Sequence, residues 1–238
     1  MSLSGREVLL VGGASGLGSA TTRMLAEEGA KLTVTYRANR ERAEEFRSVA
    51  TLVPMDLRSA DDRARVLDLV RDLYGLVIFA GVPARVRRVE ELEGVTRISF
   101  QDNFLGPMLM AREVAGYLRA NSIAGAIVLI ASMQAVHPFP ASTAYSTQKA
   151  ALVHAAKVLA KETRGPYYIR VNVVCPGVTD AGMAQESIAA GKYERYLEEQ
   201  IIPRYGQAQD VARAVRFFLE PDNYVTGQVL TVDGGLTL

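Results

Sequence analysis

The sequence predicts an α/β fold, a doubly wound, seven-stranded parallel sheet with helices on both faces. Short aliphatic runs alternate with longer segments of helical period, so consecutive strands require crossover helices and become parallel. Runs such as residues 127–130 are apolar throughout, as expected for strands that helices cover on both faces. The chain has 238 residues, 49% of them hydrophobic, which is enough for the core of one such domain.

Seven strands are expected where β-branched and aliphatic residues gather, at residues 7–11, 31–36, 51–55, 76–80, 126–131, 169–174 and 228–232. Five segments with helical spacing are expected to connect them, at residues 16–28, 60–73, 96–119, 143–162 and 208–219. Residues 180–203 are helical in propensity but follow the sixth strand without a strand of their own. This segment is expected to form a substrate lid or, alternatively, a surface helical hairpin. No linker or repeat interrupts the chain, so residues 1–238 are expected to form a single domain.

Charge argues against binding to nucleic acid or to an anionic membrane, because 27 basic residues face 26 acidic ones. Arg85, Arg87 and Arg88 form the one short basic cluster, which is more simply a solvated loop. The longest segment without acidic or basic residues, 120–148, contains Pro138 and Pro140, which exclude a membrane-spanning helix.

Cysteine and histidine are scarce, with one Cys and two His in the chain. Cys175 cannot form an internal disulfide, and so few ligands predict no catalytic metal. The first eleven residues lack a basic region followed by a long apolar stretch, so no secretory signal is expected. These features together predict a cytoplasmic protein.

A glycine-rich loop follows the first expected strand and precedes a helix. Glycine permits positive φ, and the amides at a helix N-terminus bind phosphate. The context therefore predicts a pyrophosphate site of a dinucleotide, with an ordinary tight turn as the alternative. Its residues are Gly12, Ala14, Ser15, Gly16, Leu17 and Gly18.

The end of the second expected strand carries Arg37 and Arg40 and no carboxylate. An acidic residue there binds the ribose hydroxyls of NAD, whereas arginine pairs the 2′-phosphate of NADP, so NADP(H) is predicted over NAD(H). The alternative is that both arginines are solvated. Asp56, followed by Leu57, is placed to accept a hydrogen bond from the adenine amino group or to cap the next helix.

Tyr145 and Lys149 have an i, i+4 spacing that places them on one face of a predicted helix. A nearby cation favours the phenolate, so Lys149 is expected to lower the pKa of Tyr145 toward the range useful for proton transfer. Ser132 lies at the end of the fifth expected strand, where its hydroxyl can donate to a substrate carbonyl. Coincidental packing of the pair and a strand-ending cap are the structural alternatives.

With these motifs, the chain resembles the compact, single-domain branch of the short-chain dehydrogenase/reductase family along essentially its whole length, and in particular its 3-oxoacyl-acyl-carrier-protein reductases. The resemblance implies a Rossmann fold, a catalytic set of Asn103, Ser132, Tyr145 and Lys149, and a homo-oligomer, tetramer or dimer. It also implies that Asn103 lies at a helix distortion and holds a water that connects Lys149 to solvent. The cofactor contacts assigned by resemblance, beyond the catalytic pair Tyr145 and Lys149, are Ala80, Gly81, Pro176, Gly177, Val178 and Thr179.

Two residues depart from the family pattern. Phe79 replaces an asparagine that stabilises the central sheet, and Ala181 replaces a threonine that binds the nicotinamide carboxamide, with Thr179 as a candidate substitute. The expected function is an NADP-dependent oxidoreductase that interconverts a carbonyl compound and a secondary alcohol. The alternative is a cofactor-binding sensor on the same fold. The expected pocket walls are Met133, Gln134, Phe139, Met183 and Tyr193, whereas His137 is expected to be an ordinary loop residue.

Overall fold

The computed structural model describes residues 2–238 and contains a seven-stranded sheet in the order β3-β2-β1-β4-β5-β6-β7. Every adjacent pair of strands is parallel, which confirms the predicted sheet. The strands are β1 (Glu7–Val11), β2 (Lys31–Tyr36), β3 (Ala50–Pro54), β4 (Leu73–Ile78), β5 (Ala126–Ile130), β6 (Arg170–Pro176) and β7 (Val229–Val232).

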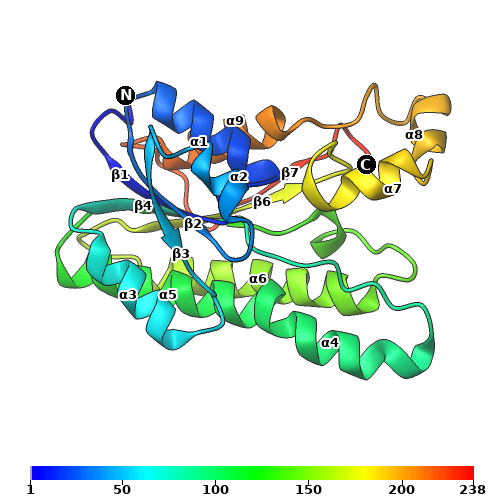
Figure 1. Ribbon diagram of the computed structural model, residues 1–238, viewed down its shortest axis with the longest axis horizontal. Coiled ribbons are helices and arrows are strands. Elements are labelled where there is room, and N and C mark those ends of the chain that lie inside the picture. Colours follow the sequence, from blue (N-terminus) through cyan, green and yellow to red (C-terminus); the bar gives the residue numbers. More distant parts are fainter. Residues whose placement is uncertain (1) are drawn as a thin grey trace.

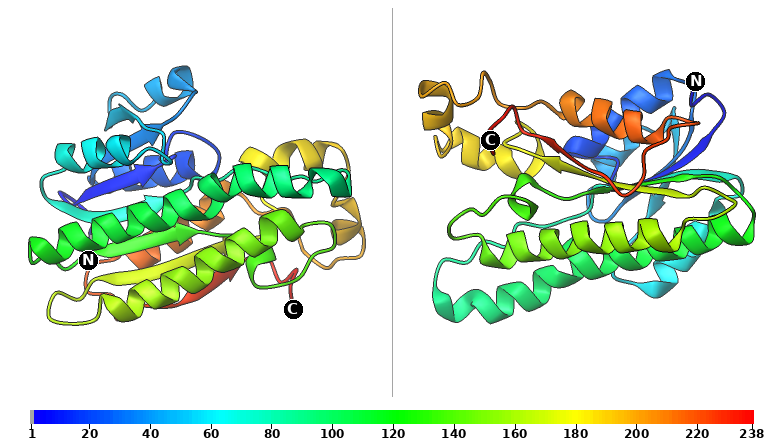
Figure 2. Two further views of the ribbon diagram at one scale, coloured as in Figure 1. Left: turned by 90° about the horizontal axis from the view of Figure 1, so that it is seen from below. Right: turned by 180° about the vertical axis from the view of Figure 1, so that it is seen from behind.

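Helices cover both faces of this sheet (Figures 1 and 2). One face carries α1 (Leu17–Glu27), α2 (Arg40–Glu44) and α9 (Ala208–Leu219). The other carries α3 (Ala60–Leu69), α4 (Leu92–Phe100), α5 (Gly106–Ala120) and α6 (Thr143–Glu162). The bounds of α6 and α9 agree with the sequence prediction, whereas the short polar helix α2 was not predicted.

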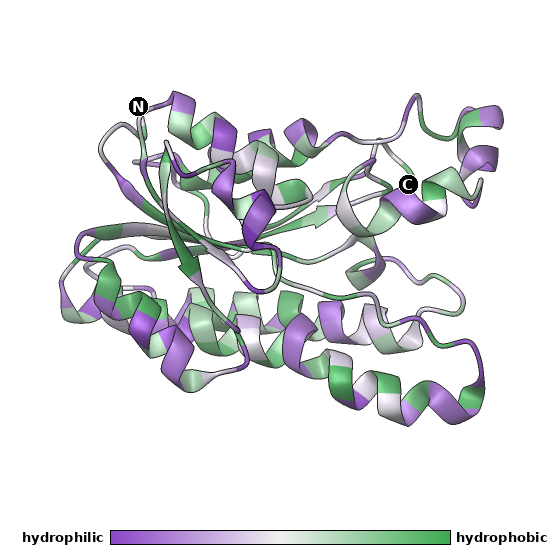
Figure 3. Cartoon of the chain, in the orientation of Figure 1, coloured by the Kyte–Doolittle hydropathy of each residue, from purple (hydrophilic) through white to green (hydrophobic). Residues whose placement is uncertain are grey.

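The central strands divide their side chains between two cores. Ile127 and Leu129 of β5 pack with the helices α3, α5 and α6, while Val128 and Ile130 pack with α1 and α9. All of β5 is buried, and Figure 3 shows the hydrophobic sheet between helices whose outer sides are largely hydrophilic. Coverage on both faces explains why this strand is apolar throughout rather than alternating.

The fourth strand begins earlier than predicted, at Leu73 instead of residue 76. Leu73 pairs with Glu7 of β1 and is fully buried, so it belongs to the sheet and not to the preceding helix. The helix α3 therefore ends at Leu69, and Val70 is extended. The bounds of β1 and β2 agree with the prediction, and the remaining strand ends differ from it by at most two residues.

The helix predicted over residues 96–119 is longer and interrupted. A π-helical turn, Gln101–Leu105, separates α4 from α5 without breaking the chain direction. A π-turn adds a residue to the helical repeat, which a 3.6-residue hydrophobic pattern does not reveal. The distortion that the family resemblance implies at Asn103 is this turn.

Residues 180–203 extend beyond the carboxyl ends of the strands, as Figure 1 shows at the position of α7 and α8. The segment contains the short helices α7 (Gln185–Ala189) and α8 (Glu194–Glu198) and adds no strand. Within residues 2–238, no helix is long and apolar enough to cross a membrane.

Candidate active site

The glycine loop connects β1 to α1 at the carboxyl edge of the sheet. Gly12 and Gly16 have φ values of +75° and +54°, which disfavour any residue with a Cβ. A Cβ on Gly18 would lie 2.5 Å from the carbonyl oxygen of Gly12, so this position also needs glycine, because the backbone folds back on itself. The loop ends at the first amides of α1, where the Gly18 amide donates to the Ser15 carbonyl oxygen at 3.0 Å.

Two adjoining cavities lie along this edge. The larger has a volume of about 680 Å³ and the smaller about 280 Å³. Gly12, Ser15, Ala80 and Gly81 line both, so the cavities meet at the glycine loop. The larger cavity also contacts Leu17, Gly16 and the predicted segment Pro176, Gly177, Val178 and Thr179, while the smaller contacts Ala14 and Leu57.

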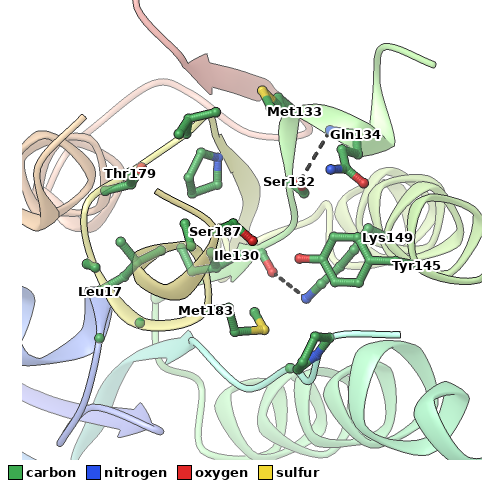
Figure 4. Close-up of a pocket in the computed structure, with 18 of the residues that line it drawn as sticks. Leu17, Ile130, Ser132, Met133, Gln134, Tyr145, Lys149, Thr179, Met183 and Ser187 are labelled. Carbon is green, nitrogen blue, oxygen red and sulfur yellow. Dashed lines mark hydrogen bonds between the residues drawn. The ribbon is translucent and has the colours of Figure 1, made fainter. Parts of the chain in front are cut away.

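Ser132, Tyr145 and Lys149 all face the larger cavity (Figure 4). The Ser132 hydroxyl oxygen accepts from the backbone amide of Gln134 at 3.2 Å. The Lys149 ammonium donates to the carbonyl oxygen of Ile130 at 3.1 Å. The end of β5 and the first two turns of α6 therefore bring the three predicted side chains to one space.

Burial has the largest effect on the pKa values of Tyr145 and Lys149. It raises the pKa of Tyr145 to about 12, with a hydrogen bond to Ser132 acting in the opposite direction. Burial also lowers the pKa of Lys149 to about 8. The expectation that Lys149 lowers the tyrosine pKa is thus wrong for this structure, because desolvation of the phenolate outweighs any favourable charge.

Asn103 lies on the π-turn and is completely buried. Its amide oxygen accepts from the Val82 backbone amide at 2.8 Å, and its amide nitrogen donates to the Val82 carbonyl at 3.1 Å. The same nitrogen donates to Gln148 at 2.9 Å. A Cβ on Gly81 would lie 3.1 Å from both the Asn103 oxygen and the Lys149 ammonium, so the two side chains approach each other at this glycine.

Sequence reasoning missed Gln148, which is 3% exposed between the catalytic pair. Its amide nitrogen donates to the Ser99 hydroxyl at 3.0 Å and the Thr96 carbonyl at 3.1 Å, which ties α6 to α4. Buried polar groups need such partners. Its place inside the Tyr145–Lys149 spacing was the only signal in the sequence.

The smaller cavity has a different charge arrangement from the one predicted. Arg37 lines it, but its guanidinium pairs with Asp102 at 2.5 Å, so a carboxylate reaches the arginine from another element. Arg40 lines neither cavity and pairs with Glu44 on its own helix. In this structure the Arg40 guanidinium thus lies outside both cavities, and its role toward a cofactor stays a prediction.

Of the two roles predicted for Asp56, the cap of the next helix is wrong. Asp56 lines neither cavity, and its carboxylate binds the Arg58 guanidinium at 2.5 Å, which holds the pKa of Asp56 at about 2. The helix α3 is capped instead by Ser59, whose hydroxyl accepts from the amide of Asp62 at 3.2 Å. A cation that the sequence did not indicate, Arg42 of α2, lines the larger cavity.

The two departures from the family pattern both lie at the larger cavity. Phe79 and Ala181 line it. The Thr179 hydroxyl donates to the carbonyl of Gly177 at 3.2 Å, so in this structure it satisfies its own loop. Met133, Gln134, Met183 and Tyr193 line the cavity as expected, whereas Phe139 does not. His137 stacks edge-on against Phe139 outside it.

Residues 180–203 contact the glycine loop directly. A Cβ on Gly16 would lie 3.3 Å from the Cα of Gly182. Arg85, which follows β4, pairs with Glu186 at 2.7 Å and donates to the Ser187 hydroxyl at 3.3 Å. The segment therefore forms one wall of the larger cavity, and part of the predicted basic cluster is used to hold it there.

Metal ligands do not gather in the part of the chain that the structure describes. Within residues 2–238, no group of three or more His, Cys, Asp or Glu side chains is placed so that it could hold a metal ion. Cys175 is completely buried, and burial raises the pKa of its thiol to about 11. The side chains that line the larger cavity include the Ser132 hydroxyl, the Tyr145 phenol and the Lys149 ammonium.

Proteins similar to this chain over nearly its full length are oxidoreductases by name. The family model described as enoyl-(acyl carrier protein) reductase matches residues 12–237. A glucose 1-dehydrogenase of Gluconobacter oxydans is 33% identical, covering 99% of this chain and 93% of its own. The 3-oxoacyl-(acyl-carrier-protein) reductase FabG of Thermotoga maritima is 30% identical over 100% of both chains. The solved structure of ElxO with NADP bound matches with a TM-score of 0.86 at 25% identity, covering 99% of each chain.

Proposed function

Because this chain belongs to the short-chain dehydrogenase/reductase family, we propose that it is an NADP-preferring carbonyl reductase or alcohol dehydrogenase. The observation that supports this best is that Ser132, Tyr145 and Lys149 share one cavity with the glycine loop. The residue set can thus act on a substrate oxygen beside a bound dinucleotide. The whole chain would then act as one dinucleotide-binding domain with a lid at residues 180–203.

The loop residues fit the phosphates of a nicotinamide dinucleotide. The positive φ angles of Gly12 and Gly16 and the tight contact at Gly18 open a backbone cradle that side chains would fill. Arg42 adds a cation to the same cavity, and its guanidinium makes no ion pair within residues 2–238. These residues would hold the pyrophosphate, while Pro176 and Gly177 would border the nicotinamide.

When bound, the reduced dinucleotide supplies a hydride to the carbonyl carbon. The Ser132 oxygen already accepts from the Gln134 amide, which leaves its proton for the substrate oxygen. Tyr145, with a pKa of about 12, keeps the proton that the developing alkoxide requires. The reverse oxidation would use the same groups.

Lys149 and Asn103 would support proton supply to Tyr145. Lys149 is 2% exposed and carries its charge at neutral pH, because its pKa of about 8 lies above 7. Its approach to Asn103 at Gly81 puts the ammonium beside the π-turn. We infer that a water held at this turn connects Lys149 to solvent.

The preference for NADP rests on Arg37. It lines the smaller cavity and follows a strand end without a carboxylate, and guanidinium groups bind phosphate in bidentate fashion. ElxO, which shares the fold, has NADP bound in its structure. We therefore assign the 2′-phosphate to Arg37 alone of the two arginines predicted.

The substrate would lie between the catalytic groups and the lid. Met133, Met183 and Tyr193 give this part of the cavity apolar walls, so a carbonyl compound or secondary alcohol with an apolar portion fits. A cytoplasmic location and a homo-oligomer, tetramer or dimer, belong to the same proposal. Exposed Ile98 on α4 and Val158 on α6 support a subunit contact through these helices.

Phe79 and Ala181 favour a second candidate, a cofactor-binding sensor with little catalysis. Titration with NADPH and NADH, followed by nicotinamide fluorescence, and then a panel of ketones, quinones and a short 3-oxoacyl thioester separates the candidates. Tighter binding of NADPH with turnover of a panel member is expected. Binding without turnover of any compound favours the sensor, tighter NADH binding rejects the assignment of Arg37, and no binding of either cofactor rejects both candidates.

A further inference from the structure

Arg37 and Asp102 form an ion pair between segments that are 65 residues apart in sequence. The guanidinium follows β2, and the carboxylate comes from the π-turn between α4 and α5. The Asp102 side chain is 12% exposed, compared with 46% for Arg37. The carboxylate is thus the more buried partner, and it holds the arginine against the wall of the smaller cavity.

No other charged side chain among residues 2–238 lines this cavity. Asp56 and Arg58 lie outside the lining, pair with each other, and interact electrostatically with Arg37 and Asp102. Asp102 and Arg37 are therefore the two charges that a ligand in this cavity would meet directly. The site presents one anion and one cation, although the end of β2 alone presents only a cation.

These two charges favour different groups on a ribose. A 2′-phosphate carries close to two negative charges, so it is attracted to Arg37 and repelled by a carboxylate at contact distance. A free 2′-hydroxyl is a donor, and a carboxylate accepts from it. Since the guanidinium is already bound to Asp102, a phosphate must displace the carboxylate or share the arginine with it.

We propose that Asp102 is a selectivity residue for the cofactor: it competes with the 2′-phosphate for Arg37 and so limits the preference for NADP over NAD. This inference rests on the proposed function, since it needs a dinucleotide at the glycine loop. It adds a residue from the π-turn to a specificity otherwise attributed to the end of β2. Asp102 weakens the attraction of Arg37 for the 2′-phosphate in the same cavity.

The test uses the full chain and two unreactive nucleotides, adenosine 2′,5′-bisphosphate and AMP, with calorimetric measurement of Kd. Asp102→Asn removes the charge with little change in shape. The variant is expected to bind the bisphosphate about tenfold more tightly relative to AMP than the wild type does. A ratio that stays the same or moves toward AMP overturns the proposal.

Asp68→Asn is the matched control, because Asp68 is exposed on α3 and lines neither cavity. It changes the net charge equally and should leave the ratio unchanged. In an Arg37→Gln background, Asp102→Asn should raise the relative affinity for the bisphosphate by less, because no arginine is then released for the phosphate. Asp102→Ser repeats the test if the asparagine variant does not fold.

The same titrations distinguish failure of the proposed function from failure of the role proposed for Asp102. Wild-type protein that binds neither these nucleotides nor NADPH rejects the proposed function and this inference together. Wild-type protein that binds NADPH, combined with a ratio that Asp102→Asn does not alter, rejects only the role of Asp102.

Discussion

The ammonium nitrogen of Lys149 lies 3.1 Å from the carbonyl oxygen of Ile130, on a side chain that is 2% exposed. Burial of this charge lowers its pKa from 10.5 to about 8, which destabilises the folded protein wherever the unfolded lysine is protonated. Lys149→Met should therefore raise the free energy of unfolding at pH 7 by about 2–3 kcal/mol. Urea denaturation measures this change.

The same pKa shift fixes the pH dependence of that difference. Between pH 8 and 10.5 the unfolded state binds the lysine proton and the folded state releases it, so the wild type becomes more stable as pH rises. The advantage of Lys149→Met should be complete below pH 8 and shrink above it. Lys157→Met, on the exposed side of α6, should show neither effect. An advantage that is constant from pH 7 to 10 would contradict the burial argument.

Removal of the Tyr145 hydroxyl tests the proposed proton donor. Tyr145→Phe should reduce kcat by about 10² to 10⁴ in the reductive direction, because no other phenol replaces the lost proton. The Kd for NADPH should change little. Tyr193→Phe alters a second phenol on the same cavity and should have a much smaller effect on kcat. Wild-type turnover in Tyr145→Phe would exclude Tyr145 as the donor.

Substitution of Gly18 tests whether the glycine loop needs a residue without a Cβ at this position. An added Cβ would lie 2.5 Å from the Gly12 carbonyl oxygen and 2.7 Å from the Gly13 Cα, and backbone atoms cannot move aside cheaply. Gly18→Ala should cost about 1–3 kcal/mol of stability and weaken NADPH binding. Gly116→Ala, in the open on α5, should instead stabilise by about 0.5–1 kcal/mol. Thermal unfolding and fluorescence titration measure the two effects.

Removal of the ion pair between Arg85 and Glu186 tests whether it holds the lid, residues 180–203, in place. Both side chains are more than half exposed, so the pair is weak and its loss should not unfold the protein. Arg85→Gln should raise KM for the substrate by up to about fivefold and speed tryptic cleavage after Lys192, with little change in kcat. Arg88→Gln breaks a pair within one turn, with Glu91, and is the control. Equal cleavage rates in both variants would show that Arg85 does not hold the lid.

Local patterns explain which features could be predicted from sequence. The glycine loop depends on a few adjacent residues, and the Tyr145–Lys149 spacing depends on one helical turn. The parallel sheet could be predicted because most of the crossover helices were visible as periodic segments, with α2 as the exception. For the same reason, residues 143–162 and 208–219 have the predicted helical bounds.

Features that depend on distant contacts were not visible. Asp102 is an ordinary helix residue in sequence, and only the fold brings it to Arg37. Spacing showed that Lys149 was near Tyr145 but not that the Tyr145 phenol is desolvated, which reversed the expected pKa shift. Arg42 was missed because a short polar helix such as α2 has too few residues for a periodic signal.

The π-turn has a consequence for how this protein can evolve. Asp102 and Asn103 are neighbours in sequence, yet one lines the smaller cavity beside Arg37 and the other lies next to Lys149. Deleting one residue from the turn would convert it to an ordinary α-helical turn, and both side chains would leave their positions together. An insertion or deletion in this turn cannot change the position beside Arg37 without also changing the position next to Lys149. Changes of cofactor choice at this turn are therefore confined to point substitutions.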